Sequence, residues 1–210
     1  MNIKPEDLDY VLLSHLDVVH VSGLKHVQDA KNILVSRDEL EFANNNKIRY
    51  VSNMWKGVNM KTFQFKEKPH DTNDEIYGNG PAGKVYDLFD DKKFQLINIP
   101  GHTPELAALK ITNTDTGKYV LLFSDGGYAE KSWYDMILPG IVENLNQAID
   151  SLKWIRQQSL NDNCIESLAN HDPDIEPHTI TLYSFYFSYT PFFLYNFYFI
   201  VNLIIKLNHI

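Results

Sequence analysis

Short apolar runs separated by polar segments follow one another along most of the chain, and this pattern is typical of an α/β protein. Most runs are too short for helices and are rich in strand-forming residues. We predict strands over 10–13, 33–35, 62–65, 94–99, 106–111, 119–123 and 164–168. The predicted strands over 106–111 and 119–123 are joined by a polar segment, 112–117, which indicates a hairpin connection.

Helices are predicted where the apolar residues recur every three or four positions and so fall on one face of a helix. The motif Ser36-Arg37-Asp38-Glu39 has the form of a capping box and opens a predicted helix that ends near Ala43. A longer helix follows Pro139-Gly140, with its apolar positions at Ile141, Leu145, Ala148, Ile149, Leu152 and Ile155. We also predict a helical turn over 5–8, a helix over 24–31, and a long loop over 66–84.

Candidate chemistry appears first in the loop after the 10–13 strand. His15, Asp17 and His20 lie within six residues of one another there. Imidazole and carboxylate groups are common zinc ligands, and a loop at a strand end holds side chains firmly. The alternative is a pair of surface histidines in an ordinary loop.

Three later segments repeat this arrangement and favour the metal site. Each places one histidine or aspartate after an apolar run, beside glycine, proline or asparagine. The segments are Ile99-Pro100-Gly101-His102-Thr103-Pro104, Leu122-Phe123-Ser124-Asp125-Gly126-Gly127-Tyr128 and Leu168-Ala169-Asn170-His171-Asp172-Pro173. His102 and Asp125 are therefore predicted at strand ends on one edge of a sheet.

In this order the four segments resemble the metallo-β-lactamase superfamily, and most closely its N-acyl-homoserine-lactone lactonase branch. The resemblance covers roughly Pro5 to His178. It implies an αββα sandwich and hydrolysis of a lactone or other small-molecule ester. Two zinc ions would share a hydroxide that attacks the substrate carbonyl, with the pKa of the water lowered to about 7.

The family motif H-x-H-x-D-H stands here as His15-Leu16-Asp17-Val18-Val19-His20. Asp17 replaces the second histidine, and Val19 replaces the aspartate that serves the second zinc. The resemblance therefore implies one or two zinc ions, with the second site weakened by Val19. The metal ligands that it implies are His15, Asp17, His20, His102, Asp125 and His171, with Asp125 bridging both ions and so acting in catalysis.

Tyr128 follows Asp125 by three residues, and in the lactonase branch a tyrosine at this spacing directs its hydroxyl at the substrate. This catalytic assignment favours a lactonase over a glyoxalase II-type thioesterase, which uses the same metal scaffold. The alternative is one more half-buried aromatic residue in a chain with 12 tyrosines. A further hypothesis is a catalytically inactive, truncated relic of such an enzyme.

Composition excludes some functions. The 210 residues, 44% hydrophobic, suggest one domain, and the net charge of −8 argues against a nucleic-acid partner. The single cysteine, Cys164, indicates a reducing, cytoplasmic compartment and is predicted to be a small buried residue rather than a nucleophile. His70 and His209 are predicted at the surface, and His178 ends the family-like region.

The two ends of the chain depart from the family pattern. The first motif strand starts only ten residues into the sequence, so residues 1–178 are predicted to form a partial domain that lacks its N-terminal strands. The tail, 179–210, is rich in aromatic residues, and 179–205 contains no charged residue or histidine. About 20 apolar residues can span a bilayer, so the tail predicts a membrane-spanning helix and membrane association, or else translated AT-rich DNA.

Overall fold

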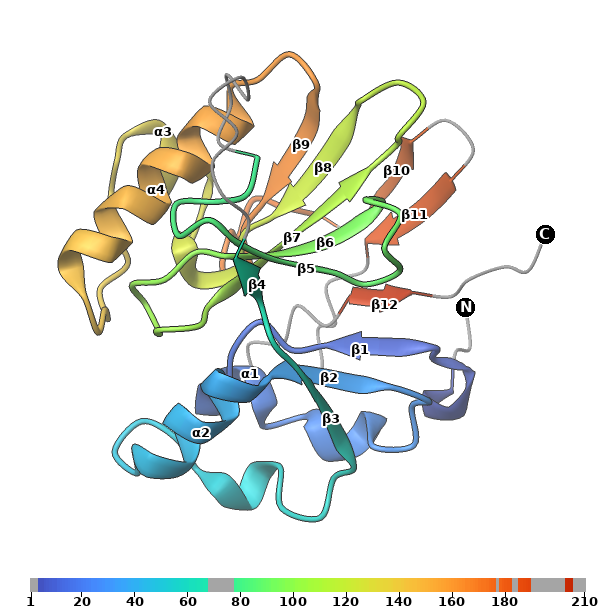
Figure 1. The fold of residues 1–210 in the computed structure, drawn as a ribbon, viewed down its shortest axis with the longest axis vertical. Helices are drawn as coiled ribbons and strands as arrows, with labels where there is room; N and C mark the ends of the chain where they lie inside the picture. The colour runs from blue at the N-terminus through green and yellow to red at the C-terminus, as the bar shows by residue number, and fades with distance from the viewer. Residues whose placement is uncertain (1–3, 68–77, 177, 183–184, 190–202, 206–210) are drawn as a thin grey trace. The chain divides into compact units, whose positions relative to one another are not determined.

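A computed structural model of the chain describes residues 4–67, 78–176, 178–182, 185–189 and 203–205 (Figure 1). Its elements form a mixed α/β fold that divides into two compact units. Unit 1 comprises Met1–Gln64 and Pro191–Ile210, and unit 2 comprises Phe65–Thr190.

Unit 1 is built on a four-stranded sheet with the order β12-β1-β2-β3. β1 is parallel to β2, β2 is parallel to β3, and β12 is antiparallel to β1. The strands are β1 (Tyr10–Leu12), β2 (Ile33–Ser36), β3 (Met60–Phe63) and β12 (Leu203–Ile205). The helices are α1 (Val18–Val21), α2 (Arg37–Asn45) and the 3-10 turns Pro5–Asp7, Leu24–Val27 and Ser52–Met54.

The core of unit 1 explains why these short segments hold their places. Val11, Ile33 and Val35 from the strands are almost fully buried with Leu16 and Leu24 from the segments that follow β1. Burying a side chain of this size stabilises a fold by about 1.5–3 kcal/mol relative to leaving it exposed. The predicted strands over 10–13 and 33–35 are therefore confirmed to within one residue.

The predicted capping box at Ser36 is wrong, although α2 does begin there. The Ser36 side chain makes no capping hydrogen bond. The Glu39 side chain is instead fully buried, and its Oε1 accepts a hydrogen bond of 3.0 Å from the backbone N–H of Leu16. Glu39 therefore ties α2 to the loop that follows β1.

Unit 2 is built on a six-stranded sheet with the order β4-β5-β6-β7-β8-β9, in which only β8 and β9 are parallel. Its strands are β4 (Lys66–Glu67), β5 (Lys84–Asp87), β6 (Phe94–Asn98), β7 (Ala107–Thr112), β8 (Tyr119–Leu122) and β9 (Cys164–Leu168). A separate hairpin joins β10 (His178–Leu182) to β11 (Phe185–Tyr189). The helices are α3 (Glu130–Tyr134), α4 (Leu145–Ser159) and the 3-10 turn Ser124–Gly126.

The long helix α4 covers one face of this sheet (Figure 1). Leu152 and Ile155 of α4 pack in one buried cluster with Ile97, Ile99 and Leu121 of the strands. The helix is amphipathic, as the sequence predicts, because Leu152 and Ile155 are buried while the charged side chains of Asp150 and Lys153 are exposed.

α4 begins four residues later than predicted, and both Ile141 and Leu145 are 55% exposed rather than buried. The backbone N–H groups of Glu143 and Asn144 donate to the carbonyl of Gly101, which holds this segment out of the helix. Asn144 then caps α4 by accepting a hydrogen bond from Gln147 N. Sequence periodicity could not reveal this contact with a distant turn.

Other boundaries also differ from the prediction. The helix predicted over 24–31 is a 3-10 turn that ends at Val27, and β3 starts at Met60 because it pairs with β2 over its whole length. The predicted loop over 66–84 contains β4, and β5 begins at Lys84, while residues 68–77 lie outside the described range.

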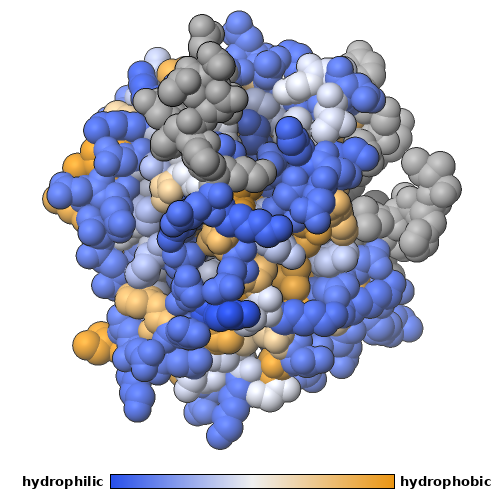
Figure 2. Space-filling model, in the orientation of Figure 1, coloured by the Kyte–Doolittle hydropathy of each residue, from blue (hydrophilic) through white to orange (hydrophobic). Residues whose placement is uncertain are grey.

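The prediction of a membrane-spanning helix over 179–205 is not supported. Where this range is described, it forms parts of β10, β11 and β12, and residues 183–184 and 190–202 lie outside the description. Within the described ranges, no helix is both long and apolar enough to cross a membrane. On the face drawn in Figure 2, hydrophilic residues cover most of the described surface. The predictions for His70 and His209 fall on residues outside the described ranges.

Candidate metal centre

Three predicted ligands, His15, Asp17 and His20, form the N-terminal ligand set in unit 1. β1 is parallel to β2, and Leu13 N donates to the carbonyl of Leu34, so the loop that carries His15 and Asp17 starts from a fixed strand. His20 follows on α1, whose first turn begins with hydrogen bonds to the Asp17 carbonyl. All three side chains are buried.

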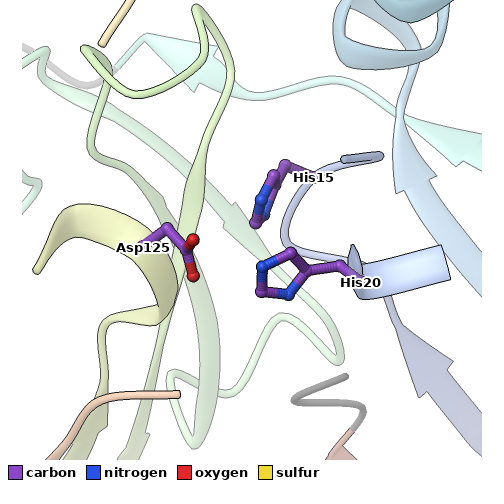
Figure 3. Close-up of side chains that lie close together, drawn as sticks. All are labelled: His15, His20 and Asp125. Carbon is purple, nitrogen blue, oxygen red and sulfur yellow. The ribbon is translucent and has the colours of Figure 1, made fainter. Parts of the chain in front are cut away.

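The two imidazoles of this set lie side by side, with ring centroids 4.2 Å apart (Figure 3). The Ser14 hydroxyl lies 3.0 Å from His15 Nδ1 and fixes the rotation of that ring. His15 Nε2 then lies 3.9 Å from Asp17 Oδ2. A hydrogen bond to one ring nitrogen is how metal-binding histidines are usually oriented, with the other nitrogen directed at the metal.

Asp17 has a strong partner that the sequence did not suggest. Arg49 donates to Asp17 Oδ2 from both Nε, at 3.0 Å, and Nη2, at 2.6 Å. Arg49 lies 32 residues away, in the turn after α2, and no local spacing signals this pairing. Charge-assisted hydrogen bonds of this kind are short and about twice as strong as neutral ones.

The other three predicted ligands, His102, Asp125 and His171, form the C-terminal ligand set in unit 2. His102 follows β6, Asp125 follows β8 and His171 follows β9. β6 and β8 each pair antiparallel with β7, so they end at one edge of the sheet, as predicted. The Asp125 carboxylate is drawn in Figure 3 on the turn after its strand.

Asp125 is the centre of this set. Its Oδ2 lies 3.3 Å from His171 Nε2 and 3.7 Å from His102 Nε2. Zinc–ligand bonds of about 2.0–2.3 Å place neighbouring donor atoms roughly 3–4 Å apart, so these distances suit ligands of a shared ion. Asp125 is only 3% exposed, and the hydrogen bond to it raises the pKa of His171 above the usual value.

The backbone around His102 is tightly built. His102 Nδ1 lies 2.7 Å from the carbonyl oxygen of Ile141, which leaves Nε2 directed at Asp125. Gly101 has a φ of +138°, and a Cβ atom there would lie 2.4 Å from the Cα of Ala148. Only glycine fits this turn, because the chain both adopts a left-handed φ and touches the first turns of α4.

The turn at Asp125 is equally constrained. Ser124 has a φ of +48°, an uncommon conformation for a residue with a side chain, and strain of this kind concentrates at functional sites. Asn170 Nδ2 donates to Ser124 Oγ at 3.1 Å and joins this turn to the His171 loop. A Cβ on Gly126 would meet Ile155 Cδ1 at 2.6 Å, so the turn packs directly on α4.

Tyr128, the predicted catalytic tyrosine, lies beside His171. The two rings meet edge to face with centroids 5.3 Å apart. The Ser132 hydroxyl accepts from the backbone N–H groups of Tyr128, at 3.0 Å, and Ala129. Asp172 Oδ2 accepts from Glu130 N at 2.8 Å, so the residue after His171 is tied to the segment that carries Tyr128.

Several supporting residues could not be found from sequence patterns. Arg49, Glu39 and Asp172 each act through a contact with a segment that is distant in the sequence. Ser132, the third residue of α3, also accepts from a backbone N–H group at the start of its own helix, that of Ala129, so this contact is local.

Three further residues that the sequence singled out are not ligands of either set. Val19, in the position of the missing aspartate, is 46% exposed on α1. His178, on β10, has its Nε2 2.8 Å from Oε1 of Glu166, on β9. Cys164 is partly rather than fully buried, and it packs against the core of unit 2. Burial raises the pKa of its thiol to about 11, which keeps the thiol protonated near neutral pH.

Comparison with known proteins finds lactonases among the sequences similar to this chain. The chain is 26% identical over 174 residues to the N-acyl homoserine lactonase AttM of Rhizobium radiobacter, and 25% identical over 177 residues to AttM of Azorhizobium caulinodans. These alignments cover 83% and 84% of the chain. The chain is therefore similar in sequence to N-acyl homoserine lactonases. No family model matches it.

Solved structures of lactonases share its fold. An N-acyl homoserine lactone hydrolase with N-hexanoyl-L-homoserine at its catalytic metal centre has a TM-score of 0.61 and 24% identity, covering 82% of the chain. AidC, a dizinc quorum-quenching lactonase, has a TM-score of 0.58 and 15% identity, covering 92% of the chain. The chain spans 62% of the length of the first AttM relative and 59% of the first hydrolase.

Proposed function

We propose that the chain is a metal-dependent hydrolase that opens a lactone ring, with an N-acyl homoserine lactone as its substrate. The observation that carries the proposal is the approach of His102 and His171 to one buried carboxylate oxygen of Asp125. Its AttM relatives are lactonases, and the product bound to one solved neighbour is an acyl homoserine.

The donor types of both ligand sets suit zinc. The proposed ligands are His15, His20, His102, Asp125 and His171. Asp125, with two carboxylate oxygens, is the member that could serve two ions. With two of the four histidines at each ion, each ion would then have three protein ligands. When bound, zinc lowers the pKa of a coordinated water to about 7 and polarises an ester carbonyl.

The chain's own residues would orient the reactants. Asp125, placed beside His102 and His171, would hold the metal at the point where the attacking water is activated. Tyr128, held by Ser132 beside His171, donates its hydroxyl proton toward the substrate carbonyl or leaving oxygen. The turns at Gly101 and Ser124 keep the ligands in place before substrate arrives.

The direct test is hydrolysis of N-hexanoyl homoserine lactone by the purified full chain, followed by titration of the acid that ring opening releases. The chain is stripped with a chelator and then reloaded with zinc. We expect no activity in the stripped protein and recovery on reloading. A zinc-loaded, folded chain that does not open the lactone contradicts the proposal and favours an inactive relic.

Val19→Asp is a second test of the same site. Val19 is half exposed in the first turn of α1, where a carboxylate is accommodated and is favoured by the helix dipole. If the aspartate adds a ligand beside His20, zinc content per chain and the hydrolysis rate should both rise. Val18→Asp, one position earlier on the same turn, is the matched control and should raise neither.

A further inference from the structure

The Asp17–Arg49 ion pair bears on how many ligands unit 1 supplies. Arg49 Nε and Arg49 Nη2 both donate to a single oxygen, Asp17 Oδ2. That same oxygen is the one that lies 3.9 Å from His15 Nε2. A metal ion bound beside His15 would therefore meet a carboxylate oxygen that already binds a cation.

The pair is built into the unit rather than formed at its surface. The side chains of Arg49 and Asp17 are only 13% and 10% exposed. The guanidinium also lies 5.7 Å from the centre of the Tyr50 ring, and Tyr50 packs edge to face on Phe42. A guanidinium stays charged at any working pH, so Arg49 offers Asp17 a permanent positive partner.

Asp17 has a structural duty that this partner supports. Its carbonyl accepts the backbone N–H groups of His20 and Val21, which form the first turn of α1. Holding the Asp17 side chain therefore fixes the point at which the helix carrying His20 begins. Glu39 holds the preceding residue, Leu16, by accepting a hydrogen bond from its backbone N–H group.

We infer that Asp17 is the counter-ion of Arg49 and a positioning residue for His20, and that it is not a metal ligand. This inference rests on the proposed metal centre. It replaces the ligand role that the family motif implies for this position, and it leaves His15 and His20 as the contribution of unit 1. The positive charge of Arg49 opposes a metal ion at Asp17 and would lower the zinc affinity that a released carboxylate provides.

Zinc affinity of the full chain, measured by competition with a chromophoric chelator, separates the two roles. Asp17→Asn removes only a supporting residue and should weaken zinc binding by no more than about tenfold, whereas His15→Ala, the matched ligand variant, should weaken it by well over about 100-fold. Arg49→Gln releases the carboxylate and should tighten binding by about tenfold. The double variant should lose that gain.

Two results overturn the inference. One is a loss of affinity in Asp17→Asn as large as that in His15→Ala. The other is a weakening of zinc binding in Arg49→Gln, which would mean that Arg49 orients Asp17 as a ligand.

Thermal unfolding of the metal-stripped protein gives a readout that needs no bound zinc. Asp17→Asn and Arg49→Gln each leave one buried charge without its partner and should each lower Tm by roughly 5–10 °C. The variant that carries both substitutions should recover part of that loss. If the two losses simply add, the pair is not coupled and the inference fails. If the wild type binds no zinc at all, the proposed function fails, while this melting experiment still decides whether Asp17 serves Arg49.

Discussion

The two ligand sets lie in loops at strand ends, yet they are supported in different ways. In the C-terminal set, His102 is held by a backbone carbonyl and His171 by Asp125, so their partners carry no competing positive charge. In the N-terminal set, Asp17 is bound by an arginine. The family resemblance implies no substitution in the C-terminal set, whereas it implies one in the N-terminal set, at Asp17, and one beside that set, at Val19.

This difference shows that the residue type alone does not decide whether a carboxylate can bind a metal, because its neighbours also matter. Asp17 has the oxygen donors of a zinc ligand, but the geometry of Arg49 decides how they are used. Asp125 has the same donors and is placed among imidazoles, where a divalent cation would be neutralised rather than opposed. We therefore expect Asp125 to bind metal and Asp17 not to bind it.

The largest expected effect comes from breaking the C-terminal set at its centre. Asp125→Asn keeps the shape of the side chain but removes its charge and its ability to serve two ions. We expect lactone hydrolysis to fall by about 10³-fold and zinc content to fall with it. Asp150→Asn, at an exposed position on α4, is the control and should leave both values unchanged.

Next in size is the loss of the turn that carries His102. Gly101→Ala places a Cβ against Ala148 and forces a side chain into a left-handed φ, which should destabilise the protein by about 2–4 kcal/mol. Gly140→Ala meets nothing within 4 Å and should change stability by less than about 0.5 kcal/mol. Equal losses in the two variants, measured by urea unfolding, would show that the close contact with α4 is not required.

A smaller effect is expected from Asp172, which acts on His171 only through the backbone. Asp172→Ala removes the acceptor of the Glu130 N–H group, so the His171 loop and the Tyr128 segment lose a tie. We expect zinc affinity and kcat each to fall by about tenfold with little change in KM. Asp174→Ala, two residues on and exposed, is the control, and a similar loss there would remove the special role of Asp172.

The smallest expected effect lies away from both sets, at the His178–Glu166 pair. The carbonyl of Glu176 and the Glu166 carboxylate raise the pKa of His178 above its usual value. The charged histidine therefore stabilises the fold fully below about pH 6.5, and this contribution is lost as the pH rises through the raised pKa. Because both side chains are about one-third exposed, we expect no more than about 0.5 kcal/mol.

Thermal melting between pH 5 and pH 8 checks this sign. The Tm of the wild type should exceed that of His178→Gln at pH 5 and approach it at pH 8. A gap between the two proteins that widens toward pH 8 would contradict the assignment of the charged form as the stabilising one.

Much of the fold and the candidate site could be predicted from local patterns. Apolar runs identified β1, β2, β6, β7, β8 and β9, and the residues after them identified His102 and Asp125 at one edge of a sheet. Strand alternation and strand-end loops are local features, so they are visible in a single sequence.

The parts that could not be predicted depend on contacts between distant residues. Glu39 fits a local capping rule, but its carboxylate accepts a hydrogen bond from Leu16 N. Ile141 fits a helical period, but the segment that contains it is kept out of the helix by hydrogen bonds from Glu143 and Asn144 to the Gly101 carbonyl. The aromatic tail has the composition of a membrane segment, yet its described parts are strands. In each case tertiary hydrogen bonds outweigh a local preference of about 1 kcal/mol or less.

Zinc content of purified, reloaded protein tests the central claim most directly, because it asks whether both ligand sets bind metal in one chain. Three folded proteins are compared by elemental analysis: the wild type, His15→Ala/His20→Ala and His102→Ala/His171→Ala. We predict at least one zinc ion per chain in the wild type and a clear loss in each double variant. A wild type without zinc, or a double variant that keeps the full zinc content, would contradict the claim.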